Sequence, residues 1–324
     1  MSFLKSNKLL LWQNFCVTYG ITNRRFGNMN TGLHRYWFKN IDYYYLPVIV
    51  FTSFIMLAES CSRNSNSYPD PPGYNFSKPY VYNLPTALDE ISGLIYYPKD
   101  SGIFAIQDEK GWLFKIHLKN PLQIERWKFS NGADYEDLSL IDSAFFVLRS
   151  KGIVEKFRFA TPDSVSLESF RLGEGKNEFE TLYYDSTIHQ LILICKNCEQ
   201  DTRKEVTSFA FDPSSNTFSS AFKIETATIR EELGEDDKFR FKPSAAAIHP
   251  LTGELYIIAS VNHVLTILNK DHSVKRAYKI DPGLFKQPEG LTFTPKGDLI
   301  ISNEVADRGA AEILFFKYNK LNKR

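Results

Sequence analysis

The chain has 324 residues, of which 43% are hydrophobic and 15% aromatic, so it can bury a full core and is rich in the Phe and Tyr that favour β-strands. Its 39 basic and 38 acidic residues leave a net charge of only +1. A nucleic-acid-binding protein needs a clustered basic excess to contact phosphates, and this composition excludes that class.

The first sixty residues differ in composition from the rest. A region containing Arg24, Arg25, Arg35 and Lys39 precedes the apolar run Leu46–Ala58. A run of 13 residues is too short to cross a bilayer as a helix, but it suits the central part of a secretory signal. The basic region is long for such a signal, which suggests that translation begins at Met29. We therefore expect residues 1–61 to be a leader and the protein to be exported.

Cys61 directly follows this region, with Ser60 before it and a polar stretch after it, as at a bacterial lipoprotein cleavage site. Glu59 departs from the usual pattern, which has a small residue two positions before the cysteine. An uncleaved anchor, or no membrane attachment, therefore stays open. If Cys61 is lipidated, the protein is anchored in the bacterial cell envelope, facing the periplasm or the surface. Residues 62–79 are then a flexible linker, because their Ser, Asn, Pro and Gly give no periodic apolar face.

Residues 80–324 repeat one phrase five times: an acidic or small polar residue, a short apolar run, a turn of Pro, Gly or Asp, and a second apolar run. The phrases begin at Glu90, Glu136, Glu180, Ser244 and Glu289, with spacings of 46, 44, 64 and 45 residues. A period in the forties with several short strands per unit is typical of a β-propeller. We predict an all-β, five-bladed β-propeller, with six blades as the alternative because of the wide third spacing. The extra length near 198–205 and 230–238 is interpreted as loop insertions.

Each of the first four repeats contains four apolar segments separated by turn residues. These strands are expected at 91–97, 102–107, 112–118 and 124–129, at 138–141, 144–149, 152–159 and 166–172, at 182–185, 190–195, 206–211 and 222–228, and at 245–249, 254–259, 264–268 and 274–280. The fifth repeat has only three, at 291–294, 298–302 and 312–318. We expect residues 80–84 to supply its missing outer strand, because pairing the two ends closes the ring and removes an open sheet edge.

In a propeller, residues just before the first strand and just after the second strand of each blade meet at one mouth of the central channel. Arg149 and Lys196 are placed to neutralise the glutamates of the second and third blades, whereas the first and fifth blades, which are neighbours in a closed ring, lack such a cation. The candidate ligand-binding residues, which we call the acidic channel mouth, are Glu90, Asp108, Glu109, Glu136, Glu180, Glu289 and Glu304.

Converging carboxylates repel one another unless some are protonated or a cation lies among them. Oxygen ligands with no His or Cys beside them favour calcium or magnesium over zinc. The sequence therefore predicts a calcium site with the ligands Glu90, Asp108, Glu289 and Glu304. Two alternatives stay open: the acids cap turns and accept backbone N–H bonds, or they act in acid–base catalysis.

Cys195 and Cys198 have the spacing of a redox motif, but no helix follows whose N-terminus would activate a thiol. Either a local disulfide or two thiols fits. The six histidines show no metal-ligand spacing, and His249 is expected to be an ordinary polar side chain. Gly-x-Ser-x-Gly, phosphate-binding glycine loops and His-Glu-x-x-His do not occur, which excludes the commoner hydrolases and nucleotide-binding enzymes.

Several ordered phrases resemble the SdiA-regulated (YjiK-like) β-propeller family and, more distantly, esterase-like, phytase-like and NHL-type propellers. The phrases are Leu88-Asp-Glu-Ile-Ser-Gly-Leu94, Phe104-Ala-Ile-Gln-Asp-Glu109, Asp134-Tyr-Glu-Asp-Leu138, Phe179-Glu-Thr-Leu182, Gln287-Pro-Glu-Gly-Leu291 and Ile301-Ser-Asn-Glu304. The similarity covers roughly residues 80–320 and implies a periplasmic or membrane-associated bacterial propeller. Ser244, in place of an acid, and the cations Arg149 and Lys196 depart from a uniformly acidic mouth.

We therefore expect an exported, membrane-anchored, monomeric propeller of the SdiA-regulated type. It is expected to be a binding protein rather than an enzyme, with calcium or a small ligand at the acidic channel mouth. The alternative is a metal-dependent hydrolase of the phytase-like type, in which a metal-bound water attacks a phosphoester or ester. A scaffold that binds only proteins is the third possibility.

Overall fold

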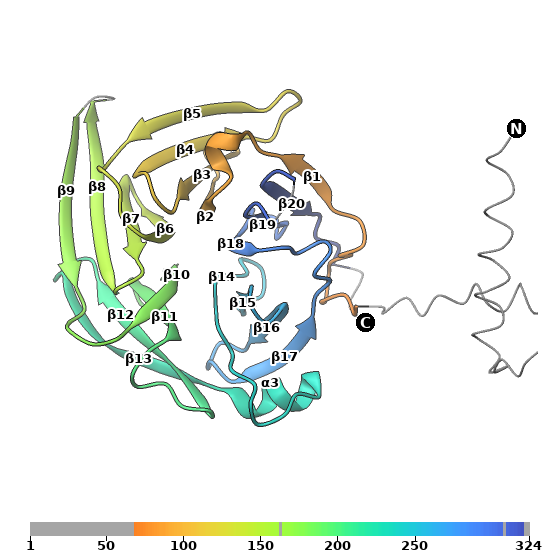
Figure 1. The fold of residues 1–324 in the computed structure, drawn as a ribbon. Coiled ribbons are helices and arrows are strands. Elements are labelled where there is room, and N and C mark those ends of the chain that lie inside the picture. Colours follow the sequence, from red (N-terminus) through yellow and green to blue (C-terminus); the bar gives the residue numbers. More distant parts are fainter. Residues whose placement is uncertain (1–67, 162–163, 307–308, 321–324) are drawn as a thin grey trace, which may run out of the picture. The chain divides into compact units, whose positions relative to one another are not determined.

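The computed structural model describes residues 68–161, 164–306 and 309–320. Five four-stranded antiparallel sheets surround a central channel in this part of the chain (Figure 1). The prediction of an all-β, five-bladed propeller is confirmed, and the six-bladed alternative is wrong. The expected leader, the start at Met29 and the lipidation site Cys61 lie outside the described residues. Within the described residues, no helix has both the length and the apolar character needed to span a membrane.

The blades follow one another along the chain, and each runs from the channel outwards. The first contains β2 (Ile91–Tyr97), β3 (Gly102–Gln107), β4 (Trp112–His117) and β5 (Gln123–Lys128); the second contains β6 (Tyr135–Ile141), β7 (Ala144–Arg149), β8 (Ile153–Thr161) and β9 (Ser164–Arg171). The third contains β10 (Glu178–Asp185), β11 (Gln190–Asn197), β12 (Glu205–Asp212) and β13 (Thr217–Glu225); the fourth contains β14 (Ala245–Ile248), β15 (Leu255–Ala259), β16 (Val264–Leu268) and β17 (Val274–Lys279). The fifth contains β18 (Pro288–Phe293), β19 (Leu299–Asn303), β20 (Glu312–Phe316) and β1 (Tyr80–Asn83).

The ring closes through β1, which pairs antiparallel with β20 from Tyr80 opposite Phe315 to Asn83 opposite Glu312. The N–H of Leu84 continues this pairing by donating to the carbonyl of Ala311 at 2.8 Å, and its side chain is only 4% exposed. The innermost strands of the fifth and first blades, β18 and β2, pack against each other. The predicted closure of the ring is confirmed, and it leaves no open edge between the last blade and the first.

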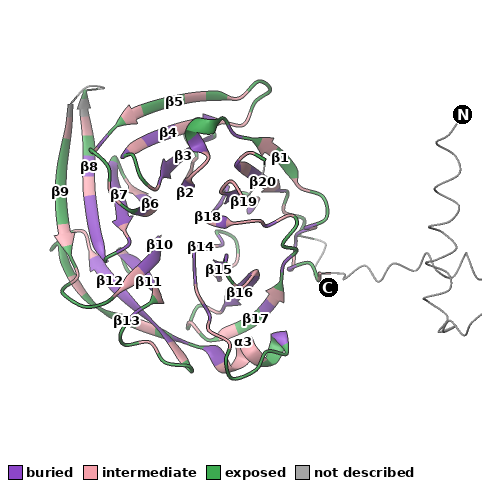
Figure 2. Ribbon diagram, in the orientation of Figure 1, coloured by how far each residue is buried: buried purple, intermediate pink, exposed green. Residues whose placement is uncertain are grey.

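The outermost strands of the blades are more exposed than the inner ones (Figure 2). Every residue of β3, β15 and β19 is buried, because neighbouring blades cover both faces of these inner strands. The outer strand β5 has no buried residue: Ile124 and Trp127 are partly buried and the other four are exposed. This difference explains why the inner strands have continuous apolar runs in the sequence.

Residues 68–79, the described part of the flexible linker expected over 62–79, pack on the propeller instead. Tyr74 is only 2% exposed, and its hydroxyl donates to the carbonyl of Gly297 at 2.6 Å. The ring of Phe76, also buried, lies 4.8 Å from that of Phe316. Two buried aromatic side chains separated by one residue are enough to fix this segment against the fifth blade.

The extra length of the third repeat forms a loop and a helix. Residues 198–204 connect β11 to β12 as a loop, as expected. The strand expected at 222–228 ends instead at Glu225, where α3 (Thr226–Leu233) begins. Ile229 and Leu233, four residues apart, are both buried, and such a spacing places them on one face of a helix. Gly234, with φ +66°, ends α3.

Candidate functional site: the acidic channel mouth

Three of the predicted site residues occupy β-bulges at the start of an innermost strand. In β6, Tyr135 pairs with Arg149 and Asp137 pairs with Leu148, so Glu136 between them has no partner in the ladder. Glu180 in β10 and Glu289 in β18 are the extra residues of equivalent bulges. A bulge changes the direction in which a side chain projects, and bulges are common beside functional sites.

The fourth blade has no such bulge in β14, and a serine takes the place of the glutamate. Ser244 is buried, and its hydroxyl donates to the carbonyl of Pro288 at 2.7 Å, next to Glu289 of the fifth blade. The serine therefore joins two blades and contributes no charge to the acidic channel mouth.

The first blade supplies the tightest group of carboxylates. Glu90, Asp108 and Glu109 each offer one oxygen, and these three atoms lie within 4.8 Å of one another. The backbone N–H of Asp108 donates to the carbonyl of Glu90 at 3.2 Å, which fixes the two residues opposite each other. Oδ1 of Asp108 is buried and has no hydrogen-bond partner among the described residues. Burial, together with the charges of Glu90, Glu109 and Glu304, raises the pKa of Asp108 to about 7.

The fifth blade extends this group around the channel. Burial and the charge of Glu90 raise the pKa of Glu304, whose N–H donates to the carbonyl of Gln287 at 2.9 Å. Burial and the charge of Glu304 raise the pKa of Glu289 to about 7, although Lys196 and a hydrogen bond from Ser260 act in the opposite direction. The first and fifth blades therefore form one continuous acidic sector, as ring closure predicts. Of the four predicted calcium ligands, Glu90 and Asp108 belong to the tight group, and Glu289 and Glu304 adjoin it.

The second blade joins the same acidic sector, in contrast to the neutralisation by Arg149 that the sequence suggested. Nη1 of Arg149 donates to Oε1 of Glu155 at 3.2 Å. Glu155 is 3% exposed, and its other oxygen accepts a bond from the hydroxyl of Tyr135 at 3.2 Å. Because a buried carboxylate costs far more free energy unpaired than one in reach of water, the guanidinium stabilises Glu155 and leaves Glu136 unneutralised.

The pKa of Glu136 is consequently strongly raised. Burial and the charge of Asp134 raise its pKa to about 8, with further contributions from Glu289 and Asp108. Asp134 was missing from the candidates, although it lies only two residues before Glu136 in the sequence. A cavity of about 550 Å³, lined by Asp108, Glu109 and residues 131–134, opens between the first and second blades at this point.

Lys196 is the cation at the centre of the mouth. Its ammonium group forms the predicted ion pair with Glu180 and lies 3.8 Å from Glu178. Its charge also lowers the pKa values of Glu136, Glu289 and Glu304 relative to burial alone. Glu180 is thereby compensated, and the uncompensated carboxylates are those of the first, second and fifth blades.

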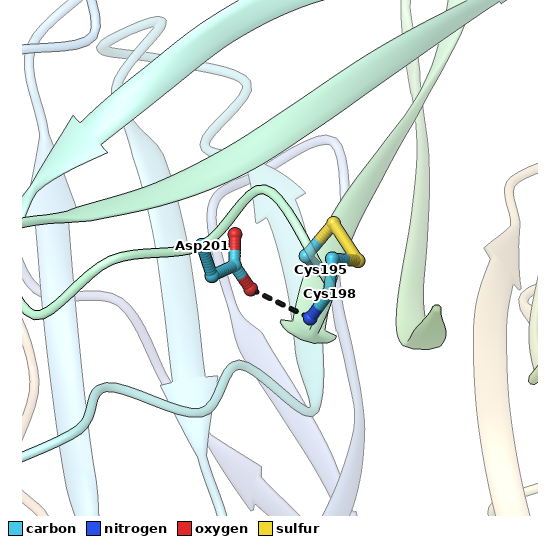
Figure 3. A group of neighbouring side chains, drawn as sticks. All are labelled: Cys195, Cys198 and Asp201. Atoms are coloured by element: carbon cyan, nitrogen blue, oxygen red, sulfur yellow. Dashed lines mark hydrogen bonds between the residues drawn. A yellow bond between two sulfur atoms is a disulfide. The ribbon is translucent and has the colours of Figure 1, made fainter. Parts of the chain in front are cut away.

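Cys195 and Cys198 form a disulfide, which resolves the two states that the sequence left open (Figure 3). Oδ2 of Asp201 accepts a bond from the N–H of Cys198 at 2.9 Å and holds the loop that follows. In this oxidised state the sulfurs are not thiolates, so the group Cys195, Cys198 and Asp201 cannot serve as a zinc site.

The opposite mouth of the channel has a different character. A cavity of about 570 Å³ is lined there by the innermost strands of all five blades. Asp137, which is buried, accepts bonds from the N–H groups of Leu138 and Leu182 at 2.8 Å each, and burial raises its pKa well above its ordinary value. His249 is also buried, and its Nδ1 accepts bonds from the N–H groups of Leu251 and Thr252 at 3.2 Å. Both side chains connect backbone segments, which is the structural role expected for His249.

No protein-family model matches the sequence, and no curated protein matches it. Solved structures with a similar fold include a glutaminyl cyclase from Myxococcus xanthus, with 13% identity and a TM-score of 0.48 over 74% of this chain and 98% of that chain. The PQQ-bound aldose sugar dehydrogenase from Streptomyces coelicolor has 10% identity and a TM-score of 0.47 over 77% of this chain and 100% of that chain. A streptogramin B lyase has 8% identity and a TM-score of 0.45 over 75% of this chain and 99% of that chain. The chain is a β-propeller structurally similar to these proteins, and the likeness bears on architecture alone.

Proposed function

We propose that this protein is an exported, membrane-anchored β-propeller that binds a divalent cation, calcium, at the acidic channel mouth. The observation that carries the proposal is the group of Glu90, Asp108 and Glu109 with their oxygens within 4.8 Å. Oδ1 of Asp108 is buried without a hydrogen-bond partner in the described part of the chain. A buried acceptor that lacks a partner costs free energy, and a cation coordinated there removes that cost.

The chemistry of the donors favours a hard cation. All three groups are carboxylates, and calcium takes six to eight oxygen ligands at variable geometry. With pKa values of about 7 for Asp108 and Glu289 and about 8 for Glu136, these carboxyl groups are partly protonated at neutral pH. Cation binding therefore competes with protons, and the affinity rises as the pH increases through this range. A small cationic ligand would have the same pH dependence.

Export and anchoring complete the proposal. The leader 1–61 with Cys61, and the resemblance to SdiA-regulated propellers, support attachment to the cell envelope of a bacterium. The Cys195–Cys198 disulfide is in accord with an oxidising compartment such as the periplasm. We propose that the propeller acts there as a monomer.

Isothermal titration calorimetry of the metal-free protein with calcium, and separately with magnesium, tests the cation site. We expect saturable binding of calcium with proton release at pH 7, because the carboxylates with raised pKa values ionise on binding. Glu90→Gln and Asp108→Asn should abolish it, whereas the matched control Glu125→Gln, on the exposed face of β5, should not. Wild-type protein that shows neither calcium binding nor bound metal on elemental analysis refutes the proposal.

A hydrolase is the second candidate, and one observation favours it. The charge of Glu289 contributes to the raised pKa of Glu136, and the two carboxyls have pKa values of about 7 and about 8, in the range where a carboxyl can act as general acid or base. With calcium bound, such a pair would transfer protons during attack of water on a phosphoester or ester. Hydrolysis of p-nitrophenyl phosphate or p-nitrophenyl acetate that depends on calcium and is lost in Glu136→Gln would support the hydrolase. Calcium binding without hydrolysis of either substrate would contradict the hydrolase and favour the binding protein.

A further inference from the structure

A second cavity, of about 460 Å³, shares Lys196 with the acidic channel mouth but has the opposite charge. We call it the basic cavity. Four cationic side chains line it, from the end of β11, the loop before β12 and the segment before β14: Lys196, Arg203, Arg240 and Lys242. Asp201 is the one carboxylate among the lining residues. The third and fourth blades thus carry a positive recess on the molecule whose first, second and fifth blades carry the negative sector.

The backbone before β14 is held so that two of these cations lie on one side. Phe241, between Arg240 and Lys242, is 2% exposed, and successive residues of an extended segment point in opposite directions. The side-chain amide of Asn262 fixes this arrangement on both sides of Phe241: its Nδ2 donates to the carbonyl of Arg240 and its Oδ1 accepts from the N–H of Lys242, each at 2.9 Å. The two cations are therefore positioned by the fold.

Lys196 is paired with Glu180, but the other three cations of the basic cavity have no carboxylate partner among the described residues. The two carboxylate oxygens of Asp201 accept bonds from the backbone N–H groups of Cys198 and Thr207, at 2.9 and 2.8 Å. Neither Arg203 nor Lys242 forms an ion pair with any of the described residues. Among the residues that the structure describes, Arg240 donates only to backbone carbonyls of its own loop, at 3.1 to 3.5 Å. Like charges gathered around a recess are stabilised when an anion neutralises them.

We propose that the basic cavity binds the anionic group of a small ligand, a phosphate or a carboxylate. Arginine presents a planar fork of N–H donors that matches the oxygens of either group, and the lysines add point charges. The proposed anion binding does not require a cation in the acidic channel mouth. It can therefore be tested in the presence of chelator, whatever the outcome of the calcium experiment.

Isothermal titration calorimetry of the full-length protein, with chelator present throughout, tests this site. Inorganic phosphate and succinate are titrated separately, so that the preferred anion is identified. We expect saturable binding of at least one of them, weakened at least about tenfold in Arg203→Gln/Lys242→Gln. The matched control Lys223→Gln/Lys275→Gln removes two cations from the outer strands β13 and β17, and should leave binding unchanged.

A measurement on the wild-type protein covers the case in which the double variant does not fold. Phenylglyoxal modifies accessible arginines, and mass spectrometry identifies the modified positions. The bound anion should slow the modification of Arg203 and Arg240 but not that of Arg126, which lies on the outer strand β5 of the first blade. Equal modification with and without the anion, equal affinities in the two double variants, or no saturable binding of either anion up to about 10 mM would overturn the proposal.

Discussion

Ionisation of Glu289 should destabilise the metal-free protein as the pH rises. In the folded protein burial and Glu304 raise its pKa from the ordinary 4.5 to about 7, so the folded state binds the proton more tightly than the unfolded chain does. The destabilisation is therefore absent below about pH 4.5, grows between pH 4.5 and 7, and is complete above pH 7. The expected direction is a loss of stability towards alkaline pH.

The magnitude follows from the two pKa values. At 1.36 kcal/mol per pKa unit, a rise from 4.5 to about 7 corresponds to about 3 kcal/mol. Water that reaches the partly exposed mouth screens the neighbouring charge and reduces this to about 2 kcal/mol. Glu289→Gln removes the ionisation, so the variant should be more stable than wild type by about 2 kcal/mol at pH 8.5 and by much less at pH 4.5.

Urea unfolding in the presence of chelator, at several values between pH 4.5 and 8.5, measures this difference directly. The Glu289→Gln variant should keep a residual pH dependence of its stability, because Asp108 and Glu136 titrate in the same range. Glu125→Gln, which removes an exposed carboxylate from β5, is the control and should follow wild type at every pH. A constant difference between Glu289→Gln and wild type over the whole range would refute the electrostatic account of the mouth.

Three further variants test other parts of the structure. Leu84→Ala should lower the free energy of unfolding by about 2–4 kcal/mol in urea, because Leu84 is buried where the ring closes, whereas Leu167→Ala at an exposed position should change it little. Cys195→Ala/Cys198→Ala should lower it by about 2 kcal/mol through the lost cross-link, and reduction of wild type with dithiothreitol should give the same loss; equal stability of the oxidised and reduced proteins would contradict this. Gly132→Ala should weaken calcium binding about tenfold in calorimetry, because at φ +119° the added Cβ would meet the backbone carbonyl of Glu109 at 2.5 Å. Gly309→Ala is the control: its φ of +118° gives the same backbone strain, but nothing lies within 4 Å of the added Cβ, so this variant should bind calcium as wild type does.

Much of the fold could be predicted because the inner strands of a propeller carry a strong and repeated pattern. Continuous apolar runs ended by Gly, Pro or Asp located β2, β3 and β7 at their observed bounds. The boundary between β13 and α3 was missed, since Phe222, Ile224 and Ile229 fit a strand and a helix equally well over so short a stretch. What separates the two is the burial of Ile229 and Leu233 against the rest of the protein, which no local pattern contains.

The site was predicted as a meeting of acidic residues, but its electrostatics were not. Repeat spacing places Glu90 near the fifth blade, whereas the pairing of Arg149 depends on Glu155, a residue that looks like an ordinary exposed charge in the sequence. The bulges at Glu136 and Glu180 leave no signal either, because the residues on both sides of each are buried and the alternation of a normal strand is not visible there. Side-chain pairing inside a low-dielectric ring is a property of the assembled blades.

Lys196 lies between the two half-cystines, inside a covalent ring of four residues. Its ammonium group contacts Glu180 in the acidic channel mouth, and the same residue lines the basic cavity. Opening that single sulfur–sulfur bond would remove the cross-link around the lysine, and any displacement of its charge would alter the field at both recesses. Reduction of the disulfide by thiols in the surrounding compartment would then change the electrostatic potential of the acidic channel mouth and of the basic cavity through one side chain.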